Sequence, residues 1–208
     1  MILIGQYDSP FVRRVGIALR LYEMPFEHRP WSVFGNAAEI ARYNPLSRVP
    51  TLVLDDGEVL IESAMILDHL DEVAGPARAL APARGLERRR MLKTCALASG
   101  LADKAVSLFY ETALHKETSA VWVERCKRQI AAVLDVLEVE RASSSTTYWH
   151  GPQINHADIA VACVLRHLTD AHPSIVLEER WPNLEAHSVR CEAIDVFQEI
   201  AQPFIAPA

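Results

Sequence analysis

The chain has 208 residues, of which 50% are hydrophobic and 23% are charged, and its formal net charge is −6 at pH 7. This balance is typical of a globular protein of one or two domains, and it excludes a disordered tail, a collagen-like repeat and a disulfide-stapled miniprotein. The sequence has neither an apolar run near the ~18 residues of a membrane span nor the basic excess that nucleic acid requires, so we expect no membrane and no nucleic-acid partner.

The first 76 residues predict alternating strands and helices. The apolar run Ile2–Ile4 indicates a short strand, and from Pro10 onward apolar side chains recur every three or four residues, as on one face of a helix. In chain order, the predicted elements are a strand over 2–4, a helix over 10–22, a strand over 26–31, a short helix over 37–42, a β-hairpin with strands over 51–54 and 58–61, and a helix over 63–73. This order predicts an α/β layer whose sheet mixes parallel and antiparallel strands.

The rest of the chain predicts helices alone. Residues 77–85 have the composition of a linker, and helical patterns follow over 86–115, 119–142, 155–171 and in shorter segments between 182 and 200. We therefore expect two domains, an α/β domain over 1–76 and an all-helical domain over 86–208. Asn155 and Asp158 have the spacing of a capping box, which is a structural element and not a chemical one.

Ser9-Pro10 lies between the first predicted strand and the first helix. A serine before a proline in the first helical position is a common helix start, so one interpretation is that Ser9 only caps the helix. The alternative is functional, because the positive end of the helix and its free amides stabilise an anion, such as a thiolate, beside the hydroxyl. The sequence alone leaves both interpretations open.

Two further motifs lie in the same half of the chain. Val49-Pro50 directly precedes the third strand, either as a trans proline that punctuates a loop or as a cis proline whose preceding residue presents its backbone to an extended peptide. Glu62-Ser63 ends the hairpin and opens the next helix. Ser63 is either the N-cap of this helix or part of a carboxylate site, with Glu62 placed to bind an ammonium group.

In this order and spacing the motifs resemble those of the glutathione transferase family. The resemblance is carried by Ser9-Pro10-Phe11 followed by Arg14, by Asn44-Pro45-Leu46 with Arg48-Val49-Pro50, and by Glu62-Ser63. It covers essentially the whole chain, because residues 1–76 resemble the thioredoxin-like domain of that family and the helical remainder is similar to its second domain. It implies a serine-type enzyme that takes glutathione as co-substrate and activates its thiolate for attack on a small electrophile.

The resemblance also implies roles for individual residues. Ser9 matches the catalytic serine that donates a hydrogen bond to the glutathione sulfur. The residues that match the glutathione-binding positions are Arg48, Val49, Pro50, Glu62 and Ser63. Among them, the backbone of Val49 is expected to pair with the cysteinyl part, Glu62 and Ser63 to hold the γ-glutamyl end, and Arg48 to reach the glycyl carboxylate. The aromatic residues expected in the pocket of the second substrate are Tyr7, Phe11, Phe34 and Tyr110.

The same sequence motifs also bear on alternative functions. Relatives of thioredoxin carry C-P-x-C where this chain has residues 9–12, so dithiol–disulfide exchange at this position is excluded. His150, His156 and Asp158 lack the spacing of metal ligands, and we expect no metal. A glutathione-dependent isomerase or dehalogenase and a non-catalytic binding protein of the same fold stay open as alternatives. The resemblance implies a homodimer, and the N-terminus lacks signal-peptide features, so we expect a cytoplasmic protein.

Overall fold

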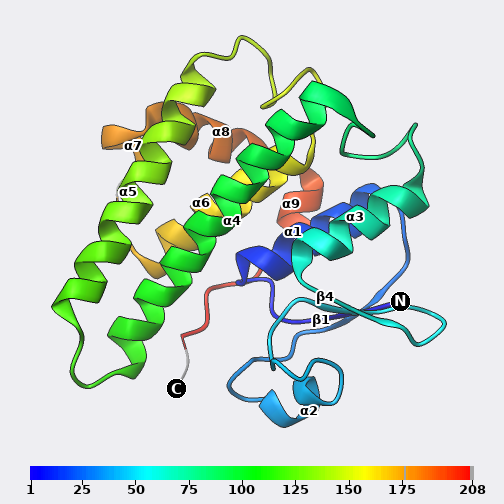
Figure 1. The fold of residues 1–208 in the computed structure, drawn as a ribbon, viewed down its shortest axis with the longest axis horizontal. Helices are drawn as coiled ribbons and strands as arrows, with labels where there is room; N and C mark the ends of the chain where they lie inside the picture. The colour runs from blue at the N-terminus through cyan, green and yellow to red at the C-terminus, as the bar shows by residue number, and fades with distance from the viewer. Residues whose placement is uncertain (176, 207–208) are drawn as a thin grey trace. The chain divides into compact units, whose positions relative to one another are not determined.

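The structure is a computed structural model that describes residues 1–175 and 177–206, and Figure 1 shows its helices and strands. In chain order these are β1 (Ile2–Ile4), α1 (Pro10–Leu21), β2 (Glu27–Arg29), α2 (Ala37–Ala41), β3 (Thr51–Val53), β4 (Val59–Ile61), α3 (Ser63–Ala74), α4 (Gly85–Leu114), α5 (Ala120–Ala142), α6 (His156–Ala171), α7 (Leu177–Arg180), α8 (Pro182–Glu192) and α9 (Asp195–Glu199). The chain folds as two compact units. The first holds Met1–Ala83 and Asp195–Pro203, and the second holds Arg84–Ile194 and the tail from Phe204. The predicted fold class, an α/β layer followed by helices, is confirmed.

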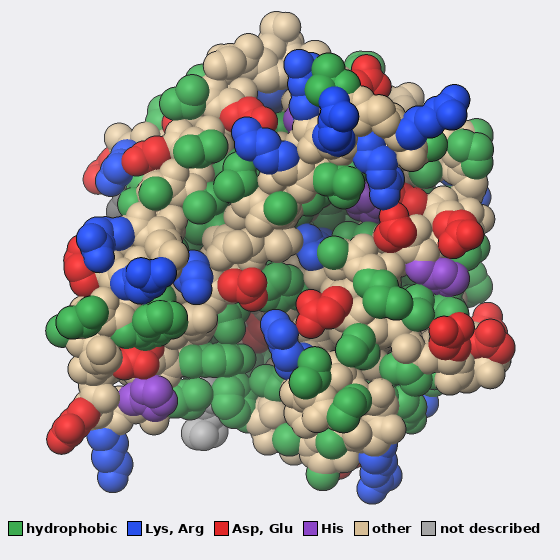
Figure 2. Space-filling view, in the orientation of Figure 1, with side chains coloured by type: hydrophobic (Ala, Val, Ile, Leu, Met, Phe, Trp, Pro, Cys, Tyr) green, Lys and Arg blue, Asp and Glu red, His purple; other side chains and the backbone are tan. Residues whose placement is uncertain are grey.

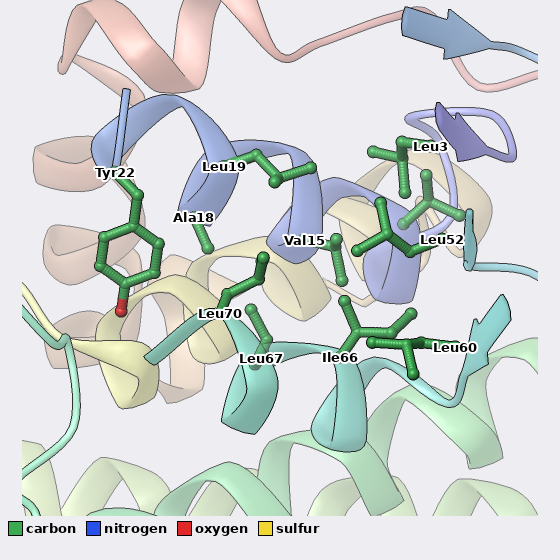
Figure 3. Packing of buried hydrophobic residues seen from close by; sticks show 11 residues of the cluster. Leu3, Val15, Ala18, Leu19, Tyr22, Leu52, Leu60, Ile66, Leu67 and Leu70 are labelled. Atoms are coloured by element: carbon green, nitrogen blue, oxygen red, sulfur yellow. The ribbon is translucent and has the colours of Figure 1, made fainter. Parts of the chain in front are cut away.

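A sheet in the order β2-β1-β3-β4 lies at the centre of the first unit. β1 runs parallel to β2 and antiparallel to β3, which pairs with β4 across the predicted hairpin. One face of the sheet packs against α1 and α3. Figure 3 shows this core, in which Leu3, Leu52 and Leu60 of the strands lie against Val15 of α1 and Ile66 of α3.

The opposite face of the sheet carries a smaller apolar cluster, formed by Ile4 of β1, Val53 of β3 and Ile40 of α2. Because successive residues of a strand point to opposite faces, strands of three residues supply both clusters. The second strand is shorter than the predicted 26–31, since only Glu27–Arg29 pairs with β1.

The segment 195–203 packs against α1 within the first unit. The buried guanidinium of Arg13 donates from Nε to the carbonyl of Ile200 and from Nη2 to the carbonyl of Phe197, both at 2.8 Å. The predicted second domain, over 86–208, includes this segment, whereas the structure places the segment in the first unit. The difference arises because contacts between residues far apart in the sequence determine its position, and no local pattern predicts such contacts. Residues 176 and 207–208 of that expected domain lie outside the described residues.

The second unit is built around α6, which is buried along most of its length and packs against α4 and α8. The predicted capping box at its start is confirmed. The Asn155 side chain accepts from the N–H of Ala157 at 2.9 Å, and the Asp158 carboxylate accepts from the N–H groups of Asn155 at 3.0 Å and of Trp149 at 2.7 Å. Helix α7 is absent from the predicted elements. Among the helices of the described residues, none has the length and hydropathy to cross a lipid bilayer.

Two fully buried titratable side chains, Asp158 and His187, meet in this unit. Burial raises the pKa of Asp158 to about 6, against the opposing effect of its backbone hydrogen bonds. Burial lowers the pKa of His187 to about 4, so the imidazole is neutral at pH 7. The approach of 3.9 Å between His187 Nε2 and the Asp158 carboxylate is therefore no ion pair at that pH.

The charged side chains on the surface form mostly exposed pairs. Arg20 Nε lies 2.8 Å from Glu199 Oε1 in the first unit, and Arg180 Nη2 lies 2.8 Å from Asp135 Oδ2 in the second. Acidic and basic side chains are interspersed on the face that Figure 2 shows. Exposed pairs contribute only ~0–1 kcal/mol each, so the stability of each unit rests chiefly on its buried clusters.

Candidate functional site

Ser9 lies at the end of the loop that joins β1 to α1, and it caps the helix. Its Oγ accepts a hydrogen bond from the N–H of Val12 at 3.4 Å, and Pro10 occupies the first helical position. The capping interpretation is therefore confirmed. This bond uses a lone pair of the hydroxyl and leaves its O–H as a donor. Since Ser9 is only half-buried, stabilisation of an anion at the helix N-terminus is compatible with the same geometry.

Gly5 lets this loop lie close to a second segment of backbone. Its φ is +130°, and a Cβ added there would lie 2.5 Å from Val12 Cγ2 and 2.8 Å from Val49 Cβ. Any larger side chain at this position would push the start of α1 away from the segment before β3. The start of α1, which Ser9 caps, can therefore lie close to Val49 only if residue 5 is glycine.

The Val49–Pro50 peptide bond is cis, in agreement with one of the two interpretations of the motif. Buried Asn44 supports this loop, because its Nδ2 donates to the carbonyl of Arg48 at 2.9 Å and to Thr51 Oγ1 at 3.3 Å. In the part of the chain that the structure describes, no hydrogen bond uses the N–H or C=O of Val49. An extended peptide can pair with these backbone groups as an added strand does.

Glu62 and Ser63 open α3, but their backbone roles differ from the prediction. Glu62 occupies the N-cap position, with a φ of +65° in the left-handed region that residues other than glycine rarely adopt. The interpretation of Ser63 as the N-cap is therefore wrong, because Ser63 is the first residue of the helix. Backbone strain of this kind persists where the surrounding structure fixes it, and it is common at ligand sites.

Arg14 contacts Ser63, and the sequence motifs did not predict this contact. Its Nη2 donates to Ser63 Oγ at 2.5 Å, and both side chains are buried. Because Ser63 Oγ accepts from the guanidinium, its own proton is directed to another acceptor, and a carboxylate bound there gains from the buried positive charge. The available signal was the position of Arg14 one turn after Pro10, on the same face of α1.

Arg48 and Glu62 form an ion pair at the rim of these groups. Arg48 Nη1 lies 3.3 Å from Glu62 Oε1, and the two side chains are 57% and 56% exposed. Because an exposed pair contributes only ~0–1 kcal/mol, each partner can exchange the other for the charged end of a ligand at little cost.

The four aromatic residues expected in a pocket lie in different surroundings. Tyr7 stacks on His28 with ring centroids 3.8 Å apart, and burial raises its pKa to about 12. In the same unit, Phe11 is half-buried and Phe34 is 46% exposed. Tyr110 is half-buried on α4 of the second unit. A pocket-lining role stays a prediction for these residues.

The first unit thus combines three kinds of binding group. They are a hydroxyl donor at a helix N-terminus (Ser9), a stretch of unpaired backbone (Val49), and a second hydroxyl above a guanidinium (Ser63) beside a carboxylate (Glu62). Together they suit a short, extended, zwitterionic peptide that carries an anionic centre. Among the described residues, no three His, Cys, Asp or Glu side chains gather as metal ligands would.

The chain is similar to known proteins. Residues 3–78 match the glutathione S-transferase N-terminal domain, and residues 120–190 match the glutathione S-transferase C-terminal domain. The uncharacterized GST-like protein YibF of Escherichia coli K12 is 33% identical over 172 residues, which cover 81% of this chain and 82% of that protein. A probable maleylacetoacetate isomerase 2 of Drosophila melanogaster is 28% identical over 76% of this chain and 69% of its own length.

A solved structure extends the similarity to the whole chain. The crystal structure of a glutathione S-transferase from Methylobacterium radiotolerans, in complex with glutathione sulfonate, superposes with a TM-score of 0.89 at 29% identity. The match covers 100% of this chain and 98% of that chain. The elements of the fold, the order of the motifs and these similarities agree, and the chain belongs to the glutathione S-transferase family.

Proposed function

We propose that the protein is a glutathione transferase that binds reduced glutathione in its first unit and stabilises the thiolate through Ser9. The observation that carries the proposal is the hydroxyl of Ser9 at the N-terminus of α1, where its capping bond leaves the O–H as a donor. A free thiol has a pKa near ~8.5 and is mostly protonated at neutral pH. A hydroxyl that donates to sulfur and a helix N-terminus both stabilise the thiolate more than the thiol, so both lower this pKa.

The proposed reaction needs no covalent bond to the protein. The bound thiol releases its proton to solvent, and the sulfur keeps the electron pair. This pair forms the bond to the electrophilic carbon, while the bond from that carbon to its leaving group breaks and the leaving group takes the bonding pair. Ser9 only donates its hydrogen bond to the sulfur, so its contribution is to the population and position of the thiolate.

The remaining site residues are proposed to hold the peptide. The backbone of Val49 would pair with the cysteinyl part, and Glu62 would bind the ammonium group. Ser63, supported by Arg14, would donate to the carboxylate of the γ-glutamyl end, and Arg48 would leave Glu62 for the glycyl carboxylate. The glutathione sulfonate in the Methylobacterium relative supports this choice of ligand. For the electrophile we propose contacts with Phe11 and Phe34 of the first unit.

The decisive experiment is an ultraviolet titration of the thiolate of glutathione bound to the protein, with free glutathione as reference. We expect a thiol pKa at least about one unit below that of the free peptide, equivalent to ~1.4 kcal/mol. Ser9→Ala should abolish most of this shift and lower turnover by ~10–100-fold. Ser119→Ala is the matched control, because Ser119 caps α5 in the same way, accepting from the N–H of Trp122 at 3.3 Å. An unshifted thiol pKa in the wild-type protein refutes the proposal.

A second candidate is a glutathione-dependent isomerase, which the similarity to the Drosophila protein favours. The two reactions differ in the fate of glutathione, since conjugation consumes it stoichiometrically and isomerisation regenerates it. A dehalogenase would release halide ion, and a non-catalytic binding protein of this fold would show no turnover with any electrophile. We further propose a cytoplasmic homodimer, for which sedimentation of the pure protein is the test of the dimer.

A further inference from the structure

The segment 195–203 is fixed to α1 by buried contacts. Besides the two hydrogen bonds from Arg13, Phe197 is fully buried, and the Cζ of Arg13 lies 5.7 Å from the centroid of its ring. Gly16 admits the next contact, because a Cβ there would lie 2.9 Å from Ile200 Cγ2. These contacts make the segment a part of the first unit and not a free tail.

The segment then reaches the loop that carries Ser9. The side-chain Oε1 of Gln202 accepts a hydrogen bond from the backbone N–H of Tyr7 at 2.8 Å. Within the loop, the N–H of Ser9 donates to the carbonyl of Gln6 at 3.2 Å. Tyr7 is one of the residues of this turn. The turn is therefore held by a hydrogen bond to Gln202, a residue 195 positions away in the sequence.

We propose that Gln202 is a positioning residue for Ser9, an inference that rests on the proposed function. The loop between β1 and α1 has five residues, 5–9. Its first residue, Gly5, is held by the hydrogen bond from its N–H to the carbonyl of Arg29 at 2.9 Å. Its last residue, Ser9, is held as the N-cap of α1. The bond to Gln202 holds the backbone of the loop's middle residue, Tyr7, whose ring also stacks on His28. A hydroxyl stabilises a thiolate only within a narrow range of distance and angle, so this third restraint contributes to the lowered thiol pKa.

Gln202→Met tests the inference, because methionine keeps the length of the side chain and loses the strong acceptor. The primary measurement is again the thiol pKa of bound glutathione. We expect the pKa to rise by about half a unit or more toward the free value, while the dissociation constant of glutathione changes less than about threefold. If Gln202 contributed only to stability, the substitution would reduce the amount of folded protein. Glutathione binding and the shift of the thiol pKa would then decrease together.

Two further variants separate the hydrogen bond from the anchoring of the segment. Gln202→Glu keeps an oxygen that accepts from the N–H of Tyr7, and it should leave the thiol pKa within a few tenths of wild type. Glu199→Gln breaks the exposed pair with Arg20 on the same segment and does not touch the Tyr7 amide. It should leave the thiol pKa unchanged. Urea unfolding of each variant verifies that the titrated protein is folded.

The possible outcomes are distinct. A raised thiol pKa in Gln202→Met alone supports the inference. A wild-type pKa in Gln202→Met, or an equal rise in all three variants, overturns it and leaves the role of Ser9 intact. An unshifted thiol pKa in the wild-type protein overturns the proposed function, and the inference with it.

Discussion

Gly5→Ala is the substitution that most directly tests how the candidate site is assembled. The new Cβ would lie 2.5 Å from Val12 Cγ2 and 2.8 Å from Val49 Cβ, and the φ of +130° is itself unfavourable for alanine. Backbone strain in this region costs about 1–3 kcal/mol, and overpacking of a closed contact costs about 1–3 kcal/mol more. We therefore expect the free energy of unfolding to fall by about 2–6 kcal/mol. The affinity for glutathione should fall at least about tenfold, because Ser9 and Val49 are pushed apart.

Gly57→Ala is the matched control for this prediction. Gly57 also has a positive φ, +90°, but no atom outside its neighbours lies within 4 Å of an added Cβ. It should therefore show the backbone strain without the steric contact, and its affinity for glutathione should equal that of the wild type. Urea unfolding followed by circular dichroism measures the stability, and isothermal titration calorimetry measures the affinity. Equal effects of the two substitutions on both quantities would refute the reasoning.

Two other predictions concern buried polar groups. Arg14→Met removes a hydrogen bond from a charged donor to Ser63, worth ~1.5–3 kcal/mol, so the dissociation constant of glutathione should rise about tenfold or more in calorimetry. An unchanged constant would remove Arg14 from the site. His187→Gln concerns stability: His187 has a folded-state pKa of about 4 against 6.5, so acid stabilises the unfolded state as the pH falls from 6.5 to 4. The stability advantage of wild type over His187→Gln should shrink by about 3 kcal/mol between pH 7 and pH 4 in urea unfolding, whereas a constant difference would contradict the buried neutral imidazole.

Local patterns predicted most of the elements, because their causes are local. The start of α1 follows from Ser9-Pro10, and the start of α6 follows from the capping box of Asn155 and Asp158. The paired strands 51–53 and 59–61 flank the turn residues that the sequence contains. The end points of β2 could not be predicted, because they depend on which residues pair with β1, and the short helix α7 has too few residues to show a period.

The site was predicted less completely, for a physical reason. The motifs indicated Ser9, Val49 and Glu62 because each occupies a junction between a strand and a helix. Arg14 and Gln202 contact residues 49 and 195 positions away, and no spacing in the sequence predicts such contacts. The left-handed backbone of Glu62 was missed for a similar reason, since only the surrounding fold can hold a glutamate in that conformation.

The docking of segment 195–203 on α1 has a consequence for synthesis on the ribosome. Helix α1 is complete after residue 21, but the carbonyl acceptors of Arg13 are made about 180 residues later. At ~5–20 residues per second, the apolar and cationic surface of α1 that these residues cover is exposed for roughly 10–40 s. Once α3 has also been made, the nascent first unit has the elements of its sheet and core but not the segment that covers α1, so this uncovered apolar surface is a target for chaperones that bind exposed apolar surface.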